Sequence, residues 1–152
     1  MVSGEEGAPK EILPLNDVAV INVEPGLANP KSARAIFDLC LQNNPKALVL
    51  STYASGALPD AFTPLISEFS KRDTPVFVVA GNYGSDHGIQ TIDYRTQVGP
   101  IKAGATLLRD VNVKHLPDVA QAVQSAINQG LTGEALKQAI VEKFGTPVEV
   151  AK

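Results

Sequence analysis

The sequence is short of the residues that build disulfides and metal sites. It has a single cysteine, Cys40, and two histidines, His87 and His115, in 152 residues. One cysteine excludes an intrachain disulfide framework and a zinc site of several cysteines, and the spacing of these residues does not suggest a metal cluster. We therefore expect no metal and no cofactor. The single thiol favours a reducing compartment, so we expect a cytoplasmic protein.

Positive charge in excess and long hydrophobic runs are also missing. The chain carries 13 Lys and Arg against 16 Asp and Glu, for a formal net charge of −3, whereas a nucleic-acid-binding domain normally shows a basic stripe. No apolar run approaches the ~20 residues needed to span a bilayer. Residues 1–10 have no apolar core and carry Glu5 and Glu6, so they do not read as a signal peptide. We expect neither nucleic acid nor membrane among the partners.

What the chain does have is enough apolar material for one core. It is 44% hydrophobic over a length typical of one domain. Residues 1–16 are dominated by Gly, Ser, Pro and Glu, which predicts a flexible linker or a remnant of expression. We expect residues 17–152 to form the domain.

Short apolar segments alternate with amphipathic ones along that domain. Residues near 18–23, 47–51, 75–79 and 105–108 are apolar toward both faces, which is typical of strands buried in a parallel sheet. Apolar residues at helical spacing predict helices over residues 30–42, 62–69, 116–128 and 132–144. The alternation predicts an α/β fold: a three-layer α/β/α sandwich around a four-stranded parallel sheet, flavodoxin-like or Rossmann-like.

Ligands of such sheets gather at the carboxyl ends of the strands, so the chemistry should lie in the loops at 24–26, 52–59 and 80–90. The glycine-rich stretch 81–88 matches neither G-x-x-x-x-G-K-[ST] nor G-x-G-x-x-G. Its Ser85, Asp86 and His87 are neighbours in sequence, and neighbours rarely point at one another as a triad requires. We expect a mobile, solvated loop in which His87 titrates near ~6.5.

A serine nucleophile is a weaker hypothesis in the loop that follows the second strand. Tyr53-Ala-Ser55-Gly56 lacks the first glycine of the G-x-S-x-G elbow. Ser55 would also need a base, and the chain offers only His87 and His115, the second of which we expect at the solvated start of a helix. Cys40 falls on the inner face of the first helix, where a free cysteine behaves as a small hydrophobe.

Several segments, in their order, resemble the C-terminal domain of bacterial-type L-asparaginases, which is shared by the related amidotransferase subunit that acts on glutamyl-tRNA. The resemblance covers residues 17–144 and rests on Val20-x-x-x-x-Pro-Gly26, Ala47-Leu-Val-Leu-Ser-Thr-Tyr-Ala-Ser-Gly-Ala-Leu-Pro59, Ala103-Gly-Ala-Thr-Leu-Leu-Arg-Asp110, and Gly88-Ile89 followed by Tyr94.

The resemblance implies a role in hydrolysing L-asparagine to L-aspartate and ammonia. In that family a larger N-terminal domain carries the threonine nucleophiles and a lysine, while the C-terminal domain completes the site of a neighbouring subunit and helps to build the dimer. It implies two partners, a Thr-bearing N-terminal domain in the same parent protein or a separate chain, and a second copy in a homodimer. The residues that it places near substrate are Tyr53, Ser55, Gly56, Ala57, Asp86, His87 and Tyr94.

The chain departs from the family pattern in ways that bear on activity. None of its threonines is followed by Asp, and Ala57 stands where the family offers an asparagine. The segment Asp110-Val-Asn-Val-Lys114 ends in a base where the family has an acid, and the Gln-Cys after the third strand is missing. We expect no catalytic residue in this chain and no turnover by the chain alone. Two other hypotheses stay open: a stand-alone, non-catalytic ligand-binding or interaction domain, and an independent hydrolase that uses Ser55 and His87.

Overall fold

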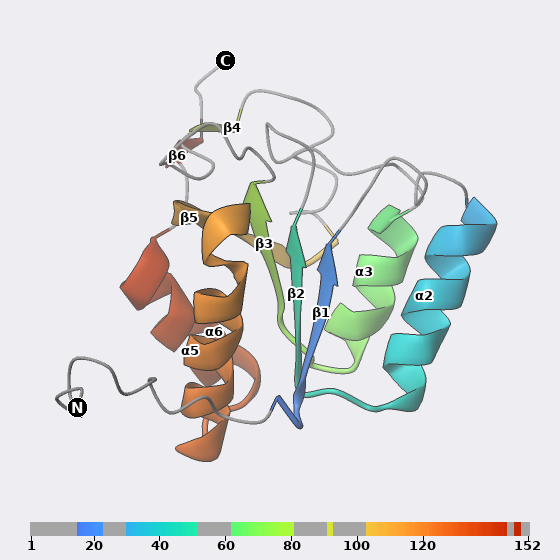
Figure 1. The fold of residues 1–152 in the computed structure, drawn as a ribbon, viewed down its shortest axis with the longest axis horizontal. Coiled ribbons are helices and arrows are strands. Elements are labelled where there is room, and N and C mark those ends of the chain that lie inside the picture. The colour runs from blue at the N-terminus through green and yellow to red at the C-terminus, as the bar shows by residue number, and fades with distance from the viewer. Residues whose placement is uncertain are drawn as a thin grey trace, which may run out of the picture.

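The computed structural model describes residues 15–22, 30–51, 62–80, 91–92, 103–145 and 148–149. Strands and helices alternate along most of this length (Figure 1). In chain order the elements are β1 (Val18–Asn22), α2 (Pro30–Gln42), β2 (Ala47–Ser51), α3 (Phe62–Lys71), β3 (Val76–Ala80), β4 (Thr91–Ile92), β5 (Ala105–Asn112), the 3-10 turn η2 (Val113–His115), α5 (Leu116–Asn128), α6 (Gly133–Phe144) and β6 (Val148–Glu149).

A four-stranded parallel sheet in the order β1-β2-β3-β5 forms the middle layer, as the sequence predicts. Because neighbouring strands follow one another along the chain, right-handed crossovers place α2 and α3 on the same face. The helices that follow the last of these strands, α5 and α6, cover the other face (Figure 1). The predicted three-layer α/β/α sandwich is confirmed.

The strands contribute side chains to two cores, one on each face of the sheet, because successive side chains of a strand point to opposite faces. Leu48 and Leu50 pack with the aromatic side chains of α2 and α3, where the rings of Phe37 and Phe62 meet edge to face with centroids 5.3 Å apart. On the opposite face, Val49 packs with the apolar side of α5 and α6. The fully buried members of this second core include Val79, Leu108, Val119, Val123 and Leu136.

Two features differ from the sequence-based expectation. β5 runs to Asn112, four residues beyond the predicted end at residue 108, and the two-residue strands β4 and β6 form a separate parallel pair that the pattern does not predict. Of the predicted linker at 1–16, residues 1–14 lie outside the described residues, so the linker stays a prediction. In the part that is described, no helix is long and apolar enough to cross a membrane.

Candidate functional site

The carboxyl ends of the parallel strands define the candidate site. Asn22 on β1 is in register with Ser51 on β2, and Ser51 with Val79 on β3. These positions therefore lie in a row across the sheet, at the edge toward which the strand arrows point in Figure 1. In parallel α/β sheets this is the edge where ligands bind.

Asn22 and Ser51 form a hydrogen-bonded pair at this edge. The Ser51 hydroxyl donates to Oδ1 of Asn22, and Ser51 itself is fully buried while Asn22 is exposed. Each is the polar last residue of an otherwise apolar strand, so the sheet register brings the two together. With Oδ1 fixed by Ser51, the amide plane of Asn22 is oriented and its NH₂ group is a donor suited to a carboxylate or amide oxygen. Ser51 is not set up as a nucleophile by this contact, since its partner is an amide oxygen and not a base.

A large irregularity in β5 shapes the other end of the edge. Val78 pairs with Leu107 but Ala80 pairs with Asn112, so two steps along β3 correspond to five along β5. Such bulges bend a strand and re-aim its side chains, and they are common beside functional sites. The extra residues include Arg109 and Asp110, whose side chains join through an Nε to Oδ1 contact of 2.8 Å.

The Arg109–Asp110 pair presents one charge of each sign to solvent. Its side chains are 41% and 51% exposed. Hydrogen bonds from Arg109 lower the pKa of Asp110, so this carboxylate stays ionised near neutral pH. The backbone N–H of Arg109 donates to the carbonyl of Gly145 at 2.9 Å, which ties the irregular stretch to the end of α6. The arrangement can bind and orient polar groups.

Two residues singled out in the sequence lie where the pattern predicts. His115 is the N-cap of α5 and is partly exposed, with no side-chain capping hydrogen bond. Cys40 is partly buried and packs against the core under α2. Burial raises the pKa of its thiol, which keeps the sulfur protonated and unreactive near neutral pH. Lys114, the base where the resembling family has an acid, is exposed in η2.

The substrate-proximal residues that the resemblance implies all lie outside the described residues, and their placement at the site stays a prediction. They are Tyr53, Ser55, Gly56, Ala57, Asp86, His87 and Tyr94, and the predicted mobile loop at 81–90 shares that status. Within the described ranges, no group of three or more His, Cys, Asp or Glu side chains is arranged to hold a metal ion.

Sequence reasoning missed Asn22, Ser51 and the Arg109–Asp110 pair as site residues. The first two carried a usable signal, because a polar residue that ends a buried apolar strand of a parallel sheet stands at the ligand-binding edge. The irregularity in β5 carried none, since the order of residues in 105–112, ATLLRDVN, does not mark where pairing with β3 is interrupted.

A small polar cavity lies at the opposite, amino-terminal edge of the sheet. It has a volume of about 200 Å³ and lies between the end of α3, the start of β3 and the first turns of α6. The carboxylate of Asp73 there lies so close to Gly133 that a Cβ on that glycine would be 2.5 Å from Oδ2. A carboxylate over the first turn of a helix stabilises that helix through its dipole. We therefore assign this cavity a structural role.

The comparisons with known proteins show a likeness of fold. No protein-family model matches the sequence, and no curated protein matches it. Among the solved structures that share its fold are L-asparaginase I from Vibrio cholerae O1 biovar eltor, with a TM-score of 0.63 and 19% identity, and the thermostable L-asparaginase from Thermococcus kodakarensis, with a TM-score of 0.60 and 22% identity.

The two matches cover very different shares of the chains that are compared. They cover 89% and 90% of this chain but only 39% and 38% of the two asparaginases. The chain thus spans about two-fifths of the length of the two asparaginases that it matches. The resemblance seen in the sequence is confirmed at the level of the fold: the chain is similar over most of its length to part of each of these two L-asparaginases.

Proposed function

We propose that this chain is the C-terminal domain of an asparaginase-like amidohydrolase, which in the complete enzyme hydrolyses L-asparagine to L-aspartate and ammonia. The observation that carries the proposal is the fold match, which takes in nine-tenths of this chain and about two-fifths of each asparaginase. A match of this shape is what one domain of a two-domain enzyme produces. Fold alone does not fix activity, so the proposal also needs support from the site.

The candidate site supports a binding role rather than a catalytic one. Its described side chains are an amide, a paired hydroxyl and an Arg–Asp ion pair, which suit the recognition of a polar substrate. Acyl transfer through a covalent intermediate needs a nucleophile beside a base. The described residues of the edge do not supply that pair, and none of the threonines of the sequence is followed by Asp, as one is in the resembling family. The proposal therefore requires a Thr-bearing N-terminal domain, in the same parent protein or as a separate chain. It also includes a homodimer and a cytoplasmic location.

The test is an assay of ammonia release from asparagine and from glutamine. The purified chain is assayed alone and after mixing with a separately purified Thr-bearing asparaginase domain. We expect no turnover by the chain alone and turnover in the mixture above that of the Thr-bearing domain by itself. Asn22→Ala should reduce the gain in the mixture, whereas Gln138→Ala, on the exposed side of α6, should leave it unchanged.

Two other outcomes separate the alternatives. Turnover by the chain alone that Ser55→Ala or His87→Ala abolishes would overturn the proposal in favour of an independent hydrolase. No turnover in the mixture, together with calorimetric binding of aspartate or asparagine to the chain, would instead favour a stand-alone ligand-binding domain.

A further inference from the structure

The connection between β3 and β5 differs from the other two connections of the four-stranded sheet. β1 is joined to β2 through α2, and β2 to β3 through α3, and both helices pack into the core on their face of the sheet. Between β3 and β5, the regular element within the described residues is the two-residue strand β4. Two residues of strand are too few to hold themselves in place, so β4 depends on a partner.

The partner of β4 comes from the residues that follow α6. β6 pairs with β4 in parallel, with Thr91 opposite Val148 and Ile92 opposite Glu149. The two strands form a sheet of their own, separate from the four-stranded sheet. Figure 1 shows both of them beyond the carboxyl ends of β1, β2 and β3. The chain after α6 therefore reaches the side of the sheet on which the candidate site lies.

A second contact fixes the start of this segment on β5. Gly145 ends α6, and its carbonyl accepts from the backbone N–H of Arg109, in the irregular stretch of β5, at 2.9 Å. The φ of Gly145 is +72°, which strains any other residue, and a Cβ there would lie 2.6 Å from Nη2 of Arg109. Residues 145–149 are thus held at both ends, first by β5 and then by β4.

We propose that residues 145–149 form a strap that holds β4 at the carboxyl edge of the sheet. The strap does for the connection from β3 to β5 what α2 and α3 do for the other two. Its consequence for activity rests on the proposed amidohydrolase function: in the sequence, β4 lies between His87 and Tyr94, which the resemblance implies near substrate. Releasing β4 should weaken the site and leave in place the two cores that α2, α3, α5 and α6 cover.

Two shortened chains test the strap by amide hydrogen exchange, measured by NMR. One chain ends at Gly145 and lacks β6, and the matched control ends at Val150 and keeps it. A strand amide exchanges only when its pair opens, so the better protected amide of β4 should exchange about 5-fold faster, or more, in the chain that ends at Gly145. The amides of β2 should keep their rates. Equal exchange of the β4 amides in the two chains would overturn the proposal.

Gly145→Ala in the full chain tests the contact with β5. The matched control is Gly130→Ala, because Gly130 also has a positive φ, +94°, but its Cβ would meet open space. Both variants carry backbone strain, yet only Gly145→Ala should speed the exchange of the β4 amides. The same acceleration in both variants would indicate a general loss of stability and would count against the strap.

The mixing assay tests what the strap does for activity. The chain that ends at Gly145 should give ~10-fold less gain in ammonia release than the chain that ends at Val150, because small displacements of groups at a site cost large factors in rate. A gain that survives the loss of β6, while the β4 amides exchange faster, would refute the positioning role. If the intact chain gives no gain at all, the amidohydrolase proposal fails, and the exchange rates still decide whether the strap holds β4. The two failures are therefore distinguishable.

Discussion

Gln124 holds the start of β1 against α5, across 107 positions of sequence. Only 2% of it is exposed. Its Oε1 accepts from the backbone N–H of Asp17 at 3.0 Å, and its Nε2 donates to Oδ2 of Asp17 and Oδ1 of Asn128, each at 3.0 Å. A buried amide is costly unless its donors and acceptor are satisfied, and here they are. This one side chain therefore fixes where the chain enters the sheet.

Replacing Gln124 with leucine should destabilise the fold. The side-chain volume is kept, but the partners at Asp17 and Asn128 lose their hydrogen bonds. We expect Gln124→Leu to lower the free energy of unfolding by ~1–3 kcal/mol, measured by urea denaturation. Gln138→Leu is the matched control, since Gln138 is exposed on α6 and bonds only one turn away, to Glu134; it should change stability by less than ~0.5 kcal/mol. Equal losses in the two variants would contradict the role assigned to Gln124.

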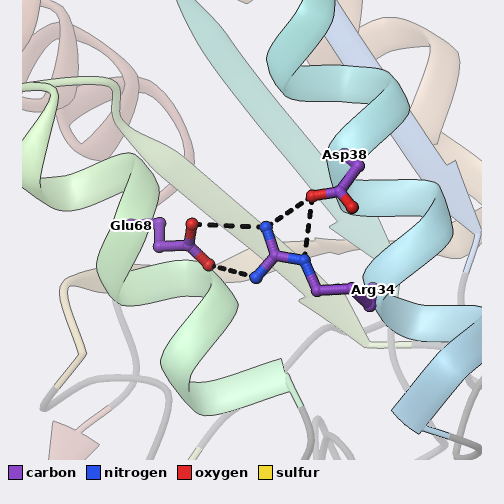
Figure 2. A network of polar contacts seen from close by, with 3 residues as sticks. All are labelled: Arg34, Asp38 and Glu68. Carbon is purple, nitrogen blue, oxygen red and sulfur yellow. Dashed lines mark hydrogen bonds and ion pairs between the residues drawn. The ribbon is translucent and has the colours of Figure 1, made fainter.

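Arg34 links α2 to α3 on the surface, through Asp38 on its own helix and Glu68 on α3 (Figure 2). Its hydrogen bonds lower the pKa of Asp38 and of Glu68, while those two carboxylates, Glu68 first, raise the pKa of Arg34. All three groups are largely exposed, so solvent and salt weaken the effect. A lowered carboxyl pKa in the folded state stabilises the fold above the pKa of the unfolded chain, and this contribution is lost as the pH falls through the folded value.

The pH dependence of stability should therefore change when Arg34 is neutralised. Above about pH 5, where both carboxyls are ionised, the wild type should be more stable than Arg34→Gln by a small margin. The margin should shrink as the pH falls below about 4, the ordinary pKa range of Asp and Glu, and it should also shrink in ~1 M salt. Urea denaturation at several pH values checks this. A margin that grows toward acid would show that the ion pairs do not stabilise the fold.

Among the structural elements, β5 depends on a tight turn just before it. Gly104 has a φ of +113°, a conformation that L side chains rarely adopt. A Cβ there would lie 2.8 Å from Cβ of Ser70, whose hydroxyl donates to the carbonyl of Ala103 at 2.8 Å. The end of α3 and the start of β5 are thus held at a separation that admits only glycine.

Gly104→Ala should destabilise the protein by ~2–4 kcal/mol, from backbone strain and the contact with Ser70 together. Gly130→Ala separates the two causes, because Gly130 also has a positive φ, +94°, but its Cβ would meet open space. That variant should lose only ~1 kcal/mol. Thermal or urea unfolding of both variants measures the difference, and a similar loss in the two would mean that the contact with Ser70 contributes nothing.

The elements themselves were predictable from the sequence where local pattern dictates them. The apolar run from Ala47 to Leu50 can be stable only between two covered faces, and the spacing of Phe62, Leu65, Ile66 and Phe69 gives α3 one buried side. The five-to-two irregularity of β5 against β3 was not predictable, because it depends on where a distant strand ends. The hydrogen bonds between Asp17 and Gln124 escaped prediction for the same reason, since pairing over that separation leaves no periodic signal.

At the scale of the whole molecule, sheet and helices form two cores that share their strands. Leu48 and Leu50 belong to the core under α2 and α3, and Val49, between them in sequence, belongs to the core under α5 and α6. Neither core can lose its helices without exposing the sheet that the other core also uses. The candidate site could be placed by the sequence only as an edge, because the identities of the touching groups, Asn22 and Ser51, follow from the register of that shared sheet.

The chain should therefore fold on its own, and as one cooperative unit. In a urea titration, far-UV circular dichroism and the NMR methyl signals of both cores should report a single transition. Phe37→Ala, in the first core, should cost ~3–5 kcal/mol, and Leu136→Ala, in the second, ~2–5 kcal/mol; both residues are fully buried. Each variant should shift the signals of both cores to the same lower urea concentration. Native signals from Val119 and Val123 that persist in Phe37→Ala after those of Leu48 and Leu50 have vanished would show two separable units, and the helices α5 and α6 would then hold the sheet without α2 and α3.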